Sequence, residues 1–432
     1  MTAPNGAILF NNSTGSDTTA SGLGAANVYG SGASTTGSSA VVTGIDTTGV
    51  SSGDLLWVQS SSGRQFSIIA TVDSSTQVTC DDTFANTESG RTWAIGGKRA
   101  TFDNADSRTA FTDLTSVIIE TETDQTINSS IFLGQSLGNL VKGSDGTQVI
   151  TGTHNSTHFF GKNISIADLT FETSNSTNTG TAAYQSHNGN NVMSAKNLTI
   201  DGLAYGGVSN ASNCQHRWYG CKATNITNYA IQRAGGNMYA EMTRCYVDTA
   251  SGAMNWGSGT NIGCRLHNSI ISNCSNDVLS ASNWTGTLIV YGNIFARGNS
   301  DCIAVSATNA VVDPQIAYNI FASNSGYAFN SNIDPSKAAG IYSNVYYSNS
   351  SGNTSTGSVE SDAITLTADP FVDAANGDFN LNANAGGGAT LRANNYALNT
   401  DTSVYPFRQY VSDDFDSGAG GGGSTLHPLY AN

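Results

Sequence analysis

The sequence is poor in charge and in proline. Only 11% of its 432 residues are charged, and it contains 6 prolines. Soluble domains usually carry roughly 25% charged residues, and so low a share raises the question of disorder. However, hydrophobic residues still make up 38% of the chain and occur in short β-branched runs. Few charges among many small polar residues favour a solenoid, in which like side chains stack and stacked charges would repel, over a low-complexity disordered chain.

Other features that the sequence lacks exclude further classes of protein. No apolar run approaches the ~20 residues of a membrane span, so we expect no membrane partner. Residues 1–6 lack the basic and apolar regions of a secretory signal, so we expect none. The 7 cysteines include no CxxC pair, which argues against a disulfide framework or a zinc site and predicts reduced, buried thiols. A net charge of −15 without a basic run predicts no nucleic-acid partner.

What the sequence does contain is an internal repeat between about residues 160 and 350. Asparagines recur before apolar pairs at spacings of 25, 26 and 25, at Asn268, Asn293, Asn319 and Asn344. A second column precedes short apolar strands at spacings of 24 or 25, at Asn228, Gly252, Asp277, Asp301 and Gly326. Coils of two or three short strands, paired in parallel about 4.8 Å apart, stack such positions on one another. The repeat therefore predicts an all-β, right-handed parallel β-helix. Leucine-rich repeats lack support because regular Leu positions are missing, and propeller blades need ~40–45 residues.

Composition changes divide the chain into five expected regions. Residues 1–40 are Gly/Ser/Thr-rich and predict an N-terminal arm, and residues 41–105 alternate short strands with turns and predict a small antiparallel attachment module. A short helix near residues 107–111 is expected to cover the open end of the first coil. The β-helix is expected over 106–360, a C-terminal cap over 361–417 and a flexible Gly-rich tail over 418–432.

Two segments resemble known families. Residues 369–373 (DPFVD) and 377–381 (GDFNL) resemble the closing motif of bacterial β-helix repeat proteins of the pectate-lyase-like superfamily. With the repeats, this resemblance covers roughly residues 160–390 and implies a fold rather than an activity. The stretch from residues 53–56 (GDLL) to 93–101 (WAIGGKRAT) resembles N-terminal modules of phage and phage-like β-helix proteins. This second resemblance implies a virion component that is released by lysis, and phage β-helix spikes imply a homotrimer.

Asp277, Asp301 and Arg297 are the candidate catalytic residues. Pectate-lyase-like enzymes cluster acidic residues to bind calcium and use an Arg or Lys as base, so the resemblance implies Ca²⁺ as the candidate cofactor if the chain is an enzyme. Two aspartates stacked on adjacent coils could bind a cation, or raise the pKa of one of them by mutual repulsion. The alternative is that both are ordinary turn residues, because their column also holds Asn228, Gly252 and Gly326.

The closest enzyme resemblance is to polygalacturonases. Residues 300–305 (SDCIAV) are similar to their Asp-Asp-Cys-Ile-Ala-Ile segment, and residues 275–277 (SND) fall where that family has Asn-Thr-Asp. Ser300, however, replaces the first aspartate, residues 325–327 (SGY) replace Gly-His-Gly, and no Arg-Ile-Lys follows. We therefore do not expect this activity.

Other candidate side chains give weaker signals. His154 and His158 lie in a strand-and-turn context, where they would not share a helical face as a zinc pair needs. Five aromatic residues either form a sugar-binding strip or pack beneath loops: Tyr205, Trp218, Tyr219, Trp256 and Trp284.

The leading functional hypothesis is a structural phage virion protein: an exposed β-helical spike, appendage or capsid decoration. It would be non-enzymatic, need no cofactor, form a homotrimer and have other virion proteins as partners. The alternative is a tailspike that binds or degrades a host surface polysaccharide with Asp277, Asp301 and Arg297. A bacterial surface adhesin is a third hypothesis, to which the missing secretory signal is the main objection.

Overall fold

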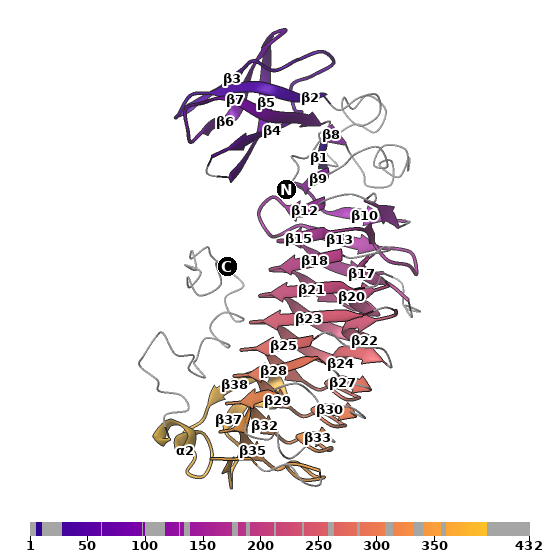
Figure 1. The fold of residues 1–432 in the computed structure, drawn as a ribbon, viewed down its shortest axis with the longest axis vertical. Coiled ribbons are helices and arrows are strands. Elements are labelled where there is room, and N and C mark those ends of the chain that lie inside the picture. Colours follow the sequence, from indigo (N-terminus) through magenta and orange to yellow (C-terminus); the bar gives the residue numbers. More distant parts are fainter. Residues whose placement is uncertain are drawn as a thin grey trace.

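The computed structural model describes residues 6–10, 28–61, 63–96, 98–99, 117–128, 130–133, 139–174, 180–186, 191–210, 213–235, 237–257, 263–282, 286–306, 314–331, 340–355 and 360–394. Its main body is a parallel β-solenoid, with an antiparallel barrel at the N-terminal end and a short C-terminal segment along its side (Figure 1). This confirms the predicted fold class. In the described part of the chain, no helix has the length and apolar character needed to cross a membrane.

One wall of the solenoid, called sheet 1, has the strand order β34-β31-β28-β25-β23-β21-β18-β15-β12-β9-β1-β8. Its solenoid strands are parallel, and β21 pairs with β23 from Cys214↔Met238 to Tyr219↔Thr243. Side chains alternate between core and exterior along each strand. The strands are β9 (Val117–Thr121), β12 (Asn139–Gly143), β15 (Ile164–Ala167), β18 (Asn191–Lys196), β21 (Cys214–Tyr219), β23 (Met238–Thr243), β25 (Gly263–His267), β28 (Thr287–Tyr291), β31 (Gln315–Ala317) and β34 (Ile341–Tyr342).

The opposite wall, sheet 2, takes up to two short strands from each coil, or one long bent strand. Its strands are β10 (Gln125–Ile127), β11 (Ile131–Phe132), β13 (Val149–Gly152), β14 (Phe159–Gly161), β16 (Thr170–Thr173), β17 (Ala182–Ser186), β19 (Thr199–Asp201), β20 (Tyr205–Ser209), β22 (Lys222–Arg233), β24 (Tyr246–Gly257), β26 (Ile270–Ser272), β27 (Leu279–Ser282), β29 (Ile294–Ala296), β30 (Ile303–Ser306), β32 (Ile320–Ala322), β33 (Phe329–Ser331), β35 (Val345–Tyr347) and β36 (Ile364–Thr365).

The core between the two sheets consists of side chains stacked from coil to coil. Phe295 stacks on Phe321 with ring centroids 4.9 Å apart, and Phe321 stacks on Tyr346 at 5.6 Å. The apolar pairs read from the sequence are therefore true stacking positions. The seven cysteines are all buried, and none forms a disulfide, as predicted.

The asparagine column is confirmed for Asn293, Asn319 and Asn344, but Asn268 does not belong to it. Ile270 pairs with Ile294, so Ser269 is the residue in register with Asn293, and its backbone N–H donates to Asn293 Oδ1 at 2.9 Å. Asn268 instead occupies the neighbouring turn position, where it has a φ of 49°. Asparagine suits both positions, because it tolerates left-handed backbone and also forms side-chain hydrogen bonds to the backbone.

The N-terminal module is a closed antiparallel barrel with the order β2-β3-β6-β5-β4-β7. Its core includes Val42, Leu56, Ile69, Val78 and Trp93. The barrel begins at residue 28 and its last strand ends at residue 96, so it starts inside the expected 1–40 arm rather than at residue 41. Its strands are β2 (Val28–Thr35), β3 (Ser39–Thr43), β4 (Leu55–Ser60), β5 (Gly63–Ser74), β6 (Gln77–Phe84) and β7 (Glu88–Gly96).

The expected arm also supplies a strand of the solenoid. β1 (Gly6–Phe10) pairs in parallel with β9 and with β8 (Lys98–Arg99), so it extends sheet 1 beyond β9, and β8 is the edge strand. The sequence of β1, GAILF, is an apolar run typical of a strand, but it lies outside the repeat that marks the stacked coils. The helix expected near residues 107–111 and the tail over 418–432 lie outside the described residues.

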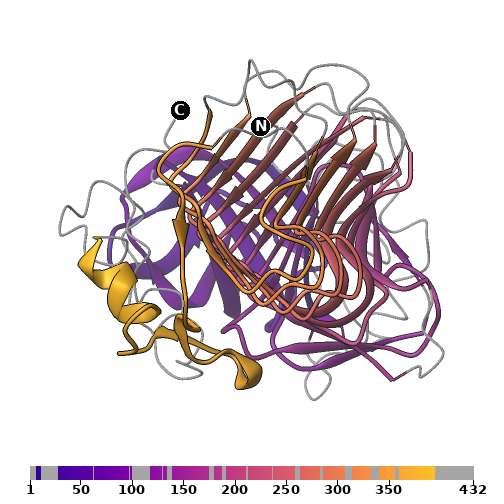
Figure 2. The same cartoon turned by 90° about the horizontal axis from the view of Figure 1, so that it is seen from below.

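The segment expected as a C-terminal cap lies along the side of the solenoid, as far as residue 394. Figure 2 shows it outside the stack of coils. It contains β37 (Phe371–Asp373), the 3-10 helix η3 (Ala374–Asn376), β38 (Asp378–Leu381) and α2 (Gly388–Ala393). Its apolar side chains, including Phe371, Phe379 and Leu391, form one cluster with Ile294 and Ile320 on the outer face of sheet 2. This segment therefore buries an apolar stripe of the last coils.

Candidate functional site

Asp277 and Asp301 lie at equivalent positions of adjacent coils, directly before the strand pair β27 and β30. Asp277 Oδ1 accepts hydrogen bonds from Ser300 Oγ at 2.6 Å and from the Asp301 backbone N–H at 3.3 Å. Asp301 Oδ1 accepts from the Tyr327 N–H at 2.7 Å, and its Oδ2 accepts from Asn330 Nδ2 at 2.6 Å. Each carboxylate is thus bonded to the next coil. Ser300, which replaces an aspartate of the polygalacturonase motif, is one of these donors.

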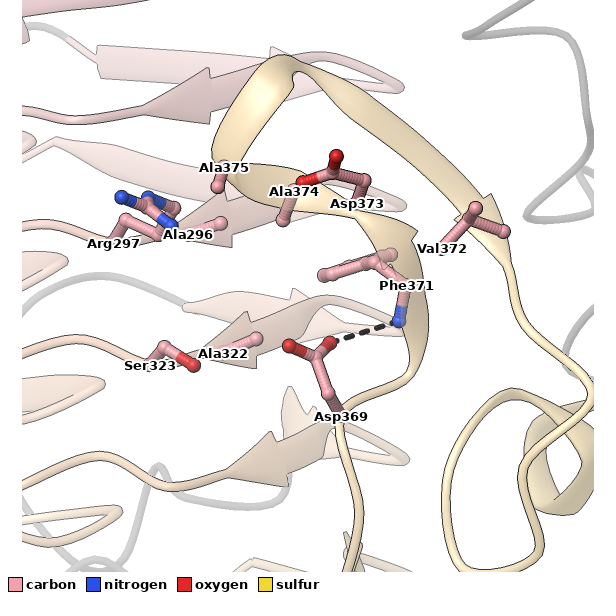
Figure 3. A pocket seen from close by; sticks show the side chains of 10 residues that line it. All are labelled: Ala296, Arg297, Ala322, Ser323, Asp369, Phe371, Val372, Asp373, Ala374 and Ala375. Carbon is pink, nitrogen blue, oxygen red and sulfur yellow. Dashed lines mark hydrogen bonds between the residues drawn. The ribbon is translucent and has the colours of Figure 1, made fainter.

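The side chain of Arg297 does not lie with Asp277 and Asp301. Arg297 follows β29 in left-handed backbone with a φ of 58°, and its Nε donates to Asn273 Oδ1 at 3.1 Å. It lines a cavity of about 170 Å³ between the solenoid and the C-terminal segment. Figure 3 shows Arg297 with Asp369 and Phe371, which line the same cavity. Within the described residues, Arg297 forms no ion pair with Asp277 or Asp301. The described residues also contain no cluster of three or more His, Cys, Asp or Glu that could hold a metal ion.

Replacing Asp301 by alanine is expected to lower the free energy of unfolding by about 2–3 kcal/mol, because it leaves the Tyr327 N–H and the Asn330 amide without their acceptor. Asp301→Asn keeps one acceptor oxygen and should cost less. Urea unfolding of the three proteins measures the difference. A variant with unchanged stability but impaired glycan binding or cleavage would restore the catalytic interpretation.

A different group of candidate functional side chains lies on the outer face of sheet 1. The register places Arg217 of β21 beside Glu241 of β23, and Glu241 beside Arg265 of β25. Adjacent strands are about 4.8 Å apart, so the three form one row of alternating charge. Tyr239 lies two residues before Glu241, and His267 two residues after Arg265, on the same face. We call these five residues the Arg–Glu–Arg face.

The charges of this row are not paired with one another. Neither arginine lies within 4.0 Å of the Glu241 carboxylate, given the ion pairs found among the described residues. Arg217 instead donates from Nη2 to Gln215 Oε1 at 3.0 Å, and its Nε is buried with no hydrogen-bond partner in the described part. The Tyr239 hydroxyl donates to Glu241 Oε2 at 3.4 Å. The row therefore keeps hydrogen-bonding capacity for a ligand.

The other two titratable groups of the face are held neutral. Burial raises the pKa of the Tyr239 phenol, and the Glu241 carboxylate raises it further. Burial lowers the pKa of His267 to about 4, with an added contribution from the positive charge of Arg265. At neutral pH both side chains can exchange hydrogen bonds with hydroxyl groups, while the arginines supply positive charge.

The fold also gathers basic residues that the sequence spreads out. Lys196 on β18 and Arg244 after β23 are exposed, as is Arg265, and all lie on or at the edge of the same four strands as Arg217. A basic patch was not expected in a chain of net charge −15. It is assembled by stacking of the coils, because intervals of 21 to 27 residues in the sequence become neighbouring strands.

The expected aromatic strip takes a different form. Trp218 and Trp256 are buried in the core, whereas Tyr219 is 38% exposed beside the Arg–Glu–Arg face. Tyr205 is half-buried on sheet 2, and Trp284 lies outside the described residues. Packing, rather than sugar binding, thus accounts for Trp218 and Trp256.

The fold and this face together define a β-solenoid with a polar, partly basic surface on one wall. No family model matches the chain, and no curated protein matches it. Among solved structures, a catalytic domain of GH87 alpha-1,3-glucanase in complex with tetrasaccharides is similar at 10% identity over 78% of each chain, with a TM-score of 0.36. The Azotobacter vinelandii mannuronan C-5 epimerase AlgE4 A-module shares 12% identity over 61% of this chain and 96% of that one, with a TM-score of 0.29. These values concern the fold and carry no argument about activity.

Proposed function

We propose that this protein binds an acidic polysaccharide across sheet 1. The observation that carries the proposal is the row of Arg217, Glu241 and Arg265, whose charges lie side by side without pairing. Arginine presents a planar fork of donors that matches a carboxylate or sulfate group. Tyr239 and His267 add neutral donors and acceptors for sugar hydroxyls.

Electrostatics favour an anionic ligand at this face in spite of the acidic chain. Charges farther away than the Debye length of about 8–10 Å are largely screened at physiological salt. Basic residues on the same and neighbouring strands, including Arg244 and Lys196, flank the row, whose own carboxylate is Glu241. A uronate chain would place a negative group on each sugar, and the alternating row can hold one such group at each arginine.

The test is binding of polygalacturonate, with neutral dextran as the control ligand. Each of Arg217→Ala and Arg265→Ala should weaken binding about tenfold, and the double variant about a hundredfold, since hydrogen bonds to charged groups contribute about 1.5–3 kcal/mol. Glu241→Gln should strengthen binding, because it removes the only carboxylate of the row.

Arg297→Ala is the matched control, because it removes an exposed arginine that lies away from this face. It should leave binding unchanged. Equal loss in Arg297→Ala and Arg217→Ala, or binding of dextran as tight as that of polygalacturonate, would contradict the proposal.

The proposal follows the alternative hypothesis of a polysaccharide-binding protein, but it places the binding site on sheet 1 rather than at Asp277, Asp301 and Arg297. The virion location, the homotrimer and the attachment role of the barrel stay predictions, as does the host surface as the source of the polysaccharide. The structural feature that favours a separate attachment part is the barrel itself, which has its own core at one end of the solenoid (Figure 1).

A further inference from the structure

A row of aromatic rings continues from the Arg–Glu–Arg face toward the last coils. His267 and Tyr291 are in register on β25 and β28, with ring centroids 6.4 Å apart. Tyr291 and Tyr318 follow at 5.2 Å, and Tyr318 and Tyr342 at 5.6 Å. These four side chains, called the aromatic row, are half-buried and extend over four consecutive strands of sheet 1.

One member of this row is held in an unusual backbone conformation. Strand β31 places Ala317, not an aromatic residue, between Tyr291 and Tyr342. The ring that fills the gap belongs to the next residue, Tyr318, whose φ is 56°. A bulky side chain is disfavoured there, because its Cβ crowds the following carbonyl oxygen.

The equivalent turns show what the fold alone requires. Other coils place Arg244, Asn268, Gly292 and Ser343 at this left-handed position, with φ values of 54°, 49°, 67° and 55°. All of these except Arg244 are small or turn-forming residues, and none is aromatic. A tyrosine at Tyr318 is therefore not needed for the turn, and its effect is to keep the row of rings continuous. Strained positions of this kind concentrate at functional sites.

We infer that the aromatic row is a second subsite, which extends the binding of an acidic polysaccharide along the solenoid axis. This inference rests on the proposed function of the Arg–Glu–Arg face, to which the row is joined at His267. Successive strands lie about 4.8 Å apart, and the ring centroids of the row lie 5.2–6.4 Å apart, spacings comparable to the length of one sugar along an extended polysaccharide. Aromatic rings present apolar faces and edges to the C–H surfaces of sugars, and tyrosine adds a hydroxyl.

The experiment compares a short and a long oligogalacturonate by calorimetry. Wild-type protein should bind the long oligomer more tightly than the short one. Tyr318→Asn should fold, because asparagine suits the left-handed turn as Asn268 does, and should reduce the gain from length about 3- to 10-fold. Its affinity for the short oligomer should not change. Tyr342→Ala should act in the same direction.

Two controls separate binding from structure. Tyr318→Phe keeps the ring and should keep the gain from length, and Tyr205→Ala on sheet 2 should change neither affinity. The subsite is overturned if Tyr318→Asn and Tyr342→Ala keep the full gain in affinity from length, or if the wild-type protein binds both oligomers equally well. Neither result would contradict binding at the Arg–Glu–Arg face. A wild-type protein that binds neither oligomer overturns the proposed function and the subsite together.

Discussion

Lowering the pH from 7.5 to 5 is expected to destabilise the fold by on the order of 6 kcal/mol, through three histidines that the fold holds neutral. Burial lowers the pKa of His216 to about 3, and burial with the charge of His154 lowers the pKa of His158 to about 4. The pKa of His267 is also lowered to about 4. In the unfolded chain all three titrate near their ordinary 6.5. Below pH 6.5 the unfolded state therefore binds more protons than the folded state, so stability present at neutral pH is lost as the pH falls.

The packing around His216 explains why it cannot simply protonate in place. Its ring stacks on Tyr184 with centroids 5.7 Å apart, and neither ring nitrogen has a hydrogen-bond partner among the described residues. Gly207 leaves the space that the two rings use, since a Cβ there would lie 2.8 Å from the Tyr184 ring and 3.1 Å from His216 Nδ1. An imidazolium in this position would be a buried charge without a partner.

The check is urea unfolding at pH 7.5 and pH 5. His216→Phe keeps a ring against Tyr184 and should remove about a third of the pH effect, because His158 and His267 supply the rest. Carboxylates with a lowered pKa, such as Asp73 and Asp145, which accept side-chain hydrogen bonds, lose their contribution only below their ordinary pKa of 3.8, outside this window. The same urea midpoint at both pH values would contradict the prediction.

The fold could be predicted because stacked coils require similar residues at a regular spacing in the sequence. Core positions such as Phe295 and Phe321 must match from coil to coil, and their spacing of 26 residues is visible without a structure. The place of β1 was harder to predict, because its apolar run GAILF lies more than 100 residues from its partner β9 and outside the repeat. The start of the barrel was hidden for a different reason, since β2 has a Gly/Ser-rich sequence.

The candidate site could be predicted only in part. The stacking of Asp277 on Asp301 follows from spacing, but the donors that engage their oxygens come from the next coil and leave no periodic signal. Arg217, Glu241 and Arg265 did have such a signal, because each is 24 residues from the next. The turn columns of Asn, Gly and Asp stand out more clearly in the sequence, however, because outward-facing strand positions hold mixed residue types.

Replacing Asn319 by alanine is expected to cost about 3–5 kcal/mol of folding free energy. Its buried amide donates to Val290 O and Asn344 Oδ1, each at 2.9 Å, and its Oδ1 accepts from the backbone and side chain of Asn293, each at 3.0 Å. Alanine would leave several of these groups buried and unsatisfied. Asn268→Gly is the matched control, because Asn268 only occupies a left-handed turn, where glycine is equally suited, and it should cost less than about 1 kcal/mol. Urea unfolding of both variants tests whether Asn268 belongs to the asparagine column. Equal losses of stability would mean that Asn268 forms the same side-chain hydrogen bonds as Asn319. A large loss in Asn319→Ala alone would support the column of Asn293, Asn319 and Asn344 without Asn268.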